Sequence, residues 1–199
     1  TLLYVSISFA QVPSYVPTNG LIAYYSFSGN ANDDTGNGFD GIVNGPALVD
    51  DRYANPNSAY SFDGANDYIQ ISTPLYGQTR SSYSINLWIY SDGGSASVFI
   101  SDRAGSSCEN RYHMTLKANN TISHSQYVSS LPIQNESITI SPISSGTWHM
   151  LTAISNIDND SISLYYDGIL QDSDSSSVWM VANNLTNIGA REGCANPMG

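Results

Sequence analysis

The sequence predicts an all-β protein, built as a two-sheet antiparallel sandwich of the jelly-roll type. Many short runs alternate apolar and polar residues, and each run is bounded by Gly, Pro, Asn, Asp or Ser. No long stretch has a helical period, and the spacing of the runs does not suit βαβ units. The 199 residues are 41% hydrophobic, which suits one domain with its own core.

The first nineteen residues divide into two segments that precede the domain. Residues 1–10 contain the apolar run LLYVSISF, which is typical of a secretory signal, so we predict a signal-peptide remnant cleaved after Ala10. The alternative is a first strand of the fold. Residues 11–19 carry two prolines and predict an extended lead-in, followed by a single domain over 20–199.

Strands are expected from residue 21 onward. The first expected strand is Leu21–Phe27, where apolar and polar residues alternate. The others are Ala59–Phe62, Tyr68–Ile71, Ser84–Tyr90, Ser97–Ser101, Arg111–Leu116, Ser137–Ile140, Trp148–Ser155 and Ser161–Tyr166. Asp167 and Gly168 follow this last run and predict a tight hairpin, because a type I′ turn needs two residues with positive φ.

Two of the expected strands contain tryptophan. In SINLWIY, Trp88 and Tyr90 occupy the face opposite an Ile/Leu/Ile face, so we expect the strand to be covered on both sides and Trp88 to lie in the core. In GTWHMLTAI, alternation predicts a buried face that starts at Trp148 and Met150. His113 and His149 fall on the opposite faces of their strands, which predicts surface positions for both.

The segment FSGNANDDTGNGFDG contains little that can be buried and many oxygen ligands. Asp, Asn and Gly adopt the turns that bring backbone carbonyls together, and calcium binds six to eight oxygens in flexible geometry. We therefore predict a calcium site with ligands Asp33, Asp34 and Asn37. As an EF-hand the loop fails, because Asn44 stands where a bidentate Glu is needed. The alternative is a solvated turn with side-chain-to-backbone hydrogen bonds only.

The charge of the chain excludes several functions. Six basic against seventeen acidic residues give a formal charge of -11, which disfavours nucleic acid and anionic membrane surfaces as partners.

The sequence lacks the residue patterns of common hydrolases. The glutamates Glu109, Glu136 and Glu192 stand singly, so no strand carries the carboxylate pair of a glycosidase. The three histidines lack zinc-binding spacing, and no GxSxG motif is present. The sequence thus predicts a non-enzymatic protein.

Aromatic residues outside the expected core suggest a sugar-binding role. The chain has fourteen tyrosines, and Tyr or Trp rings on a sheet rim can stack on the apolar face of a pyranose. The predicted ligand-binding residues are Tyr76, Tyr127 and Trp179, and Tyr83 is a further candidate. Cys108 and Cys194 are the only cysteines, and an exported context predicts a disulfide between them.

The motifs taken together resemble the laminin G-like, concanavalin A-like jelly-roll family of bacterial secreted and surface proteins. The matching segments are GLIAYYSFSGNANDDTGNGFDG, AYSFDGANDYIQI, SINLWIY, GTWHMLTAI, SISLYYDGIL and NIGAREG, in the order of the family. The resemblance implies a binding or adhesion module of a larger protein, often with bound calcium, and adds Asp63 of the SFDG turn as a ligand. It also implies a closing strand after the NIG segment, which we do not find before Gly199.

We therefore predict a non-catalytic module that binds a carbohydrate or a surface glycoprotein. The predicted location is secreted or at the cell surface, without membrane insertion, within a larger multidomain chain. A structural calcium ion and the Cys108–Cys194 disulfide are expected. The alternatives are a structural spacer domain of a large surface protein, or an accessory module of a glycoside-active enzyme whose catalytic domain lies elsewhere.

Overall fold

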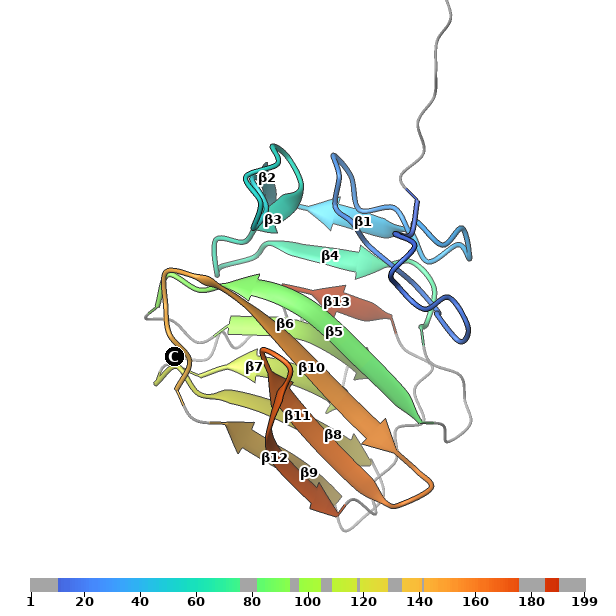
Figure 1. Ribbon diagram of the computed structural model, residues 1–199, viewed down its shortest axis with the longest axis vertical. Coiled ribbons are helices and arrows are strands. Elements are labelled where there is room, and N and C mark those ends of the chain that lie inside the picture. The colour runs from blue at the N-terminus through green and yellow to red at the C-terminus, as the bar shows by residue number, and fades with distance from the viewer. Residues whose placement is uncertain are drawn as a thin grey trace, which may run out of the picture.

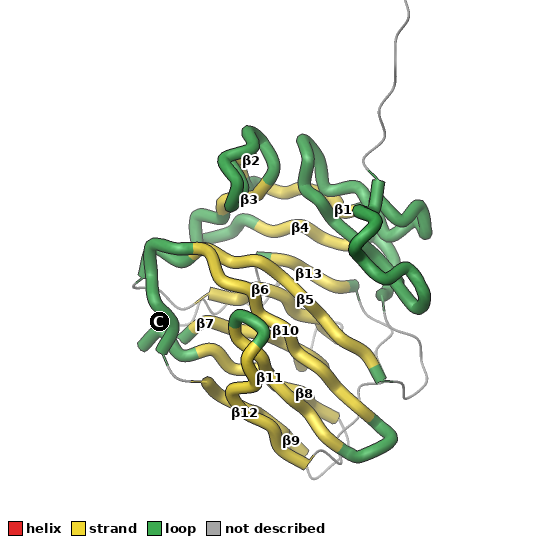
Figure 2. The backbone as a smooth tube through the Cα atoms, viewed as in Figure 1, coloured by secondary structure: helices red, strands yellow, loops and turns green. Residues whose placement is uncertain are grey.

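The computed structural model describes residues 11–75, 82–93, 97–104, 109–117, 119–128, 134–140, 142–175 and 185–189, with side chains except at 103–104, 109–111, 126–128 and 134–137. These residues form strands and loops without a helix (Figure 2). The strands are β1 (Gly41–Asn44), β2 (Ala47–Val49), β3 (Ala59–Ser61), β4 (Tyr68–Ile71), β5 (Tyr83–Tyr90), β6 (Ser97–Ala104), β7 (Glu109–Leu116), β8 (Ile122–Val128), β9 (Gln134–Ile140), β10 (Trp148–Asn156), β11 (Ser161–Tyr166), β12 (Ile169–Ser175) and β13 (Thr186–Ile188).

The strands form two antiparallel sheets that lie face to face (Figure 1). The larger sheet has the order β1-β4-β13-β6-β7-β8-β9, and the smaller has the order β12-β11-β10-β5. The hairpin β2-β3 forms a small sheet of its own at the β1 end of the molecule. This confirms the predicted two-sheet antiparallel sandwich.

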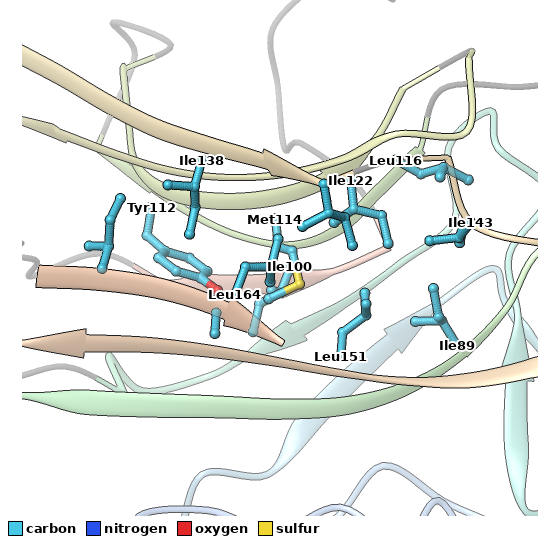
Figure 3. Close-up of a cluster of buried hydrophobic side chains, with 13 residues drawn as sticks. Ile89, Ile100, Tyr112, Met114, Leu116, Ile122, Ile138, Ile143, Leu151 and Leu164 are labelled. Atoms are coloured by element: carbon cyan, nitrogen blue, oxygen red, sulfur yellow. The ribbon is translucent and has the colours of Figure 1, made fainter. Parts of the chain in front are cut away.

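The hydrophobic core lies between the two sheets (Figure 3). Met114 and Ile122 of the larger sheet are fully buried, and so are Leu151 and Leu164 of the smaller one. Neighbouring side chains that complete the cluster include Ile89, Ile100, Tyr112, Leu116, Ile138, Ile140, Ile143, Ala153 and Ile162. Removing this much apolar surface from water is the main favourable contribution to folding of such a sandwich.

The inward face of β10 is the opposite of the one that the sequence predicted. His149, Leu151, Ala153 and Ser155 are buried, whereas Trp148 and the residues two, four and six positions after it are only partly buried on the other face. The register explains this, because Leu151 pairs with Leu87 of β5, whose Ile/Leu/Ile face also points inward. The prediction of an exposed His149 was therefore wrong as well.

The hairpin between β11 and β12 agrees with the sequence. Asp167 and Gly168 have φ values of 49° and 78°, which are the two positive angles that the short turn requires. The turn sends β12 back along β11 at the edge of the smaller sheet.

Leu21–Phe27, by contrast, was predicted to be a strand and is not one. Its backbone groups hydrogen-bond to the polar loop that follows, so they do not join a ladder.

The described part of the chain contains no helix with the length and apolar character needed to cross a bilayer.

Candidate functional site

The acidic loop after Phe27 is organised around the carboxylate of Asp33. Its Oδ1 accepts hydrogen bonds from the Tyr24 amide at 3.1 Å and the Thr35 amide at 3.0 Å, and the Thr35 hydroxyl contacts both oxygens. Only 6% of Asp33 is exposed. Burial by itself raises the pKa of Asp33, but the bonds from Thr35, Tyr24 and Phe39 outweigh it and lower the pKa.

Asp34 and Asn37 hold the same extended segment. Asp34 Oδ2 accepts from the Ser26 amide at 3.1 Å, and Asn37 Nδ2 donates to the Ile22 carbonyl at 2.9 Å. The Asp34 amide also donates to the Tyr24 carbonyl at 2.8 Å. The loop therefore substitutes for a neighbouring strand along residues 22–26, which explains why so polar a segment is present and why residues 21–27 form no ladder.

Asp63 lies in a separate turn and does not join these three residues. Its Oδ1 accepts from the Ala65 and Asn66 amides at 2.8 and 3.3 Å, and these two bonds lower its pKa. Across the described residues, no three His, Cys, Asp or Glu side chains gather as metal ligands would. The carboxylates of Asp33, Asp34 and Asp63 accept backbone hydrogen bonds, as the alternative of hydrogen-bonded turns predicts. The calcium ion stays a prediction, tested below.

The other predicted site residues are not brought together by the described structure. Tyr76, Trp179 and both cysteines, Cys108 and Cys194, lie outside the described residues, and the side chain of Tyr127 does too. The disulfide stays a prediction that a mass measurement without reductant would test. Tyr83 packs against the core and meets Tyr112 edge-on at 5.8 Å, so it is not a rim residue.

Exposed aromatic rings gather instead on the outer face of the smaller sheet. Trp88 is 42% exposed and Tyr90 is 53% exposed, so the prediction that Trp88 lies in the core was wrong. Trp148 pairs with Tyr90 across the strands, with ring centroids 5.7 Å apart. Trp88 and Tyr90 are two residues apart on β5, which places them about 6.6 Å apart along the strand.

Arg52, from the loop between β2 and β3, extends this patch. Its guanidinium carbon lies 4.3 Å from the centroid of the Trp88 ring and 4.4 Å from that of the Tyr53 ring. Tyr53 is 70% exposed. Cation–π contacts on two rings hold an otherwise flexible side chain in place.

The loop that carries Arg52 is fixed by Asp51. The Asp51 carboxylate accepts from the Tyr53 amide at 2.8 Å and from the Asn55 amide and side chain at 2.9 and 3.0 Å. Such turns hold their geometry through side-chain-to-backbone bonds. We call the set of Arg52, Tyr53, Trp88, Tyr90 and Trp148 the aromatic surface.

Two other places in the molecule are less suited to a sugar. A shallow groove of about 480 Å³ lies between the lead-in and the acidic loop. None of its lining residues is aromatic; they are Gln11, Val12, Thr18, Leu21, Asp34, Thr35 and Asn37.

The second place is the outer face of the larger sheet. A row of polar residues crosses four strands there: Asn187, Ser101, His113 and Ser125. None is more than 6% exposed, so His113 is buried and its predicted surface position was wrong.

A chain of three polar side chains connects the β9–β10 loop with the hairpin turn. Ser144 Oγ lies 2.8 Å from His149 Nε2, and His149 Nδ1 lies 2.8 Å from Asp167 Oδ2. The connectivity is that of a hydrolase triad, but such a site also needs amide donors aimed at the oxyanion. The Ile143 amide, next to Ser144, and the Gly146 amide, two residues after it, donate to the Asn120 and Ser91 carbonyls. The chain is therefore best understood as a fastening of the loop to the turn.

Residues 63–198 match the laminin G model of the concanavalin A-like lectin/glucanases superfamily. The chain belongs to this superfamily. The match covers both sheets of the sandwich apart from β1. A search of curated proteins gives no match.

Solved structures of low sequence identity show the same fold. Domain 4 of AbnA, a GH43 extracellular arabinanase from Geobacillus stearothermophilus solved with arabinotriose, is 18% identical, with a TM-score of 0.60 over 84% of this chain and 82% of that one. The binding domain of botulinum neurotoxin DC, solved with SialylT, is 15% identical, with a TM-score of 0.54 over 79% of this chain and 40% of the toxin chain. The binding domain of serotype D is 16% identical, with a TM-score of 0.57 over 81% and 41%.

Proposed function

We propose that this domain is a non-catalytic carbohydrate-binding module and that the sugar docks on the aromatic surface. The observation that carries the proposal is the exposure of Trp88 and Tyr90 on one sheet face, next to the clamped Arg52. Large exposed rings on a sheet release their hydration water when they stack on the apolar face of a pyranose, which favours binding. A nearby hydrogen-bond donor orients the hydroxyls of the sugar.

The fold of the relatives supports the same class of function. The arabinanase domain was solved with arabinotriose and one toxin binding domain with SialylT. We assign no catalysis, because the three glutamates of the sequence stand singly and the serine–histidine–aspartate chain fastens a loop. We further propose export, on the apolar run in residues 1–10, and a place within a larger chain, where the module would hold its protein on glycans.

The test is a glycan array followed by calorimetric titration of the glycans that bind. We expect Tyr90→Ala to weaken binding about 30-fold, because a central ring in a small interface contributes on the order of 2 kcal/mol. The matched control is Tyr15→Ala, since Tyr15 is another exposed tyrosine, 76% accessible, outside the aromatic surface. Circular dichroism melting checks that both variants fold. Equal affinity of the two variants would overturn the assignment of the sugar to this surface.

The structural spacer is the second candidate from the sequence. It predicts that the folded protein binds no glycan on the array. In that case the domain would serve through its folded structure alone, which the acidic loop, the hairpin turn and the core hold together.

A further inference from the structure

Arg52 is held in an unusual environment for a cation in this protein. Acidic residues outnumber basic ones by seventeen to six, so a surface arginine has many carboxylates to pair with. Within the described residues, however, the ion pair present is His149–Asp167, and no carboxylate oxygen lies within 4 Å of Arg52. Two aromatic rings hold the guanidinium instead.

The nearest carboxylate is already committed to the backbone. Asp51 uses both oxygens on the Tyr53 amide and on Asn55, and it makes no ion pair with its neighbour Arg52. Burial raises the pKa of Asp51, but the hydrogen bonds from Asn55 and Tyr53 outweigh it and lower the pKa, and the nearby charge of Arg52 adds to this lowering.

Most of the donors of Arg52 have no partner in the described part of the chain. Among the described residues its side chain makes one hydrogen bond, from Nη2 to the Tyr53 hydroxyl at 3.3 Å. Nε is shielded from solvent and has no partner there. A guanidinium carries five N–H donors in a planar fork that matches a carboxylate, so the Nη1 and Nη2 edge offers a bidentate site.

The distance from the Arg52 guanidinium to the stacking rings determines which sugar substituents can reach it. A pyranose ring stacked on Tyr90 would lie about 6.6 Å along the strand from Trp88, whose ring contacts Arg52. That separation is close to the width of one sugar residue, so a substituent of the stacked sugar or of its neighbour can reach the fork. Because the rings have already immobilised Arg52, binding costs little side-chain entropy.

We infer that the aromatic surface selects glycans that carry a carboxylate, such as uronic or sialic acids, through a bidentate contact with Arg52. The inference rests on the proposed sugar-binding function and names its ligand class. A charge-assisted pair is about twice as strong as a neutral hydrogen bond, and a carboxylate fits the planar fork better than a hydroxyl does.

The experiment compares matched ligands that differ only in charge. Oligogalacturonides and their methyl esters form one pair, and a sialylated oligosaccharide with its desialylated form makes the second. We expect the acid form to bind at least about 10-fold more tightly. Arg52→Gln should weaken binding of the acid form about 10- to 100-fold and binding of the neutral form, which loses only a hydroxyl contact, much less. Arg52→Lys keeps the charge without the fork and should fall between the two.

Ionic strength gives an independent readout. Attraction to Arg52 predicts that salt weakens binding of the acid form, whereas repulsion by the net charge of -11 would make salt strengthen it. Equal binding of acid and ester forms, or an Arg52→Gln variant that loses both equally, overturns the inference while the proposed function stands. If no glycan of either kind binds, the proposed function fails and the inference with it.

Discussion

The imidazole of His124 makes the stability of this protein dependent on pH above the range in which carboxylates titrate. His124 is fully buried on the core face of β8, where it pairs with Met114 and Ile138 and meets the Tyr112 ring at 5.1 Å. In the described part of the chain, neither ring nitrogen has a hydrogen-bond partner. Burial, with a smaller contribution from His113, lowers the pKa of His124 to about 3.

The direction of the pH effect on stability follows from the pKa of His124 in the unfolded and in the native protein. In the unfolded chain His124 has a pKa of about 6.5 and takes up a proton as the pH falls, whereas the native protein does not until about 3. Stability is therefore fully present above pH 6.5 and decreases below it by up to about 1.4 kcal/mol per pH unit. Between pH 7.5 and 5.0 the expected loss is about 2 kcal/mol, or about 4 to 8 °C in Tm.

The assay is urea unfolding of the wild type and of His124→Leu at pH 7.5 and 5.0. Leucine suits a site between Met114 and Ile138 and removes a buried polar group, so the variant should be as stable as the wild type or more so at pH 7.5. We expect the wild type to lose about 2 kcal/mol more than the variant on acidification. His113→Gln is the control, since it removes a neighbouring histidine from the other face of the sheet and should keep most of the pH dependence. Equal losses in the wild type and His124→Leu would refute the reasoning.

Three further variants test the acidic loop, the fastened turn and a close contact, each by denaturant unfolding. Asp33→Asn should cost about 1 to 3 kcal/mol, because a buried carboxylate that accepts several hydrogen bonds is replaced by a group that accepts fewer. Added calcium tests the predicted metal site: a rise in the Tm of the wild type that Asp33→Asn abolishes would confirm it, and an unchanged Tm would contradict it. Asp167→Asn should cost about 1 kcal/mol at neutral pH, and this cost should shrink as the pH falls below the unfolded pKa of about 3.9 and vanish only once Asp167 is protonated in the folded protein, because its folded-state pKa is lowered; a constant difference across pH would contradict the role of its pairing with His149. Gly189→Ala should cost about 2 to 4 kcal/mol, because φ is 93° and a Cβ would lie 2.2 Å from the Phe62 ring, and an alanine variant of native stability would show that the contact gives way.

Local pattern determined much of the fold. Tyr68–Ile71 and Ser161–Tyr166 were predicted at their observed bounds, because alternation and flanking turn residues are properties of the segment itself. The Asp167–Gly168 turn was predictable for the same reason, since its two positive φ angles are a local requirement. Ile42 and Val43 of β1 are both exposed, so that strand had no alternating signal to detect.

The sequence indicated sugar binding through aromatic residues and named Tyr76, Tyr127 and Trp179, whose side chains lie outside the described residues and which stay predictions. It did not predict the aromatic surface. Trp88 and Tyr90 were visible as an aromatic i, i+2 pair, which was the available signal.

Composition, strand alternation and the turn dipeptide thus determined an acidic, antiparallel sandwich, because those signals are carried by neighbours in the chain. The tertiary structure decided which apolar face of β5 and β10 turns inward, since both faces carry apolar residues and only the pairing of Leu87 with Leu151 against the larger sheet distinguishes them. It also decided that Arg52 meets Trp88. That contact joins a loop to a strand in another sheet, and no local rule of backbone geometry reaches across such a distance.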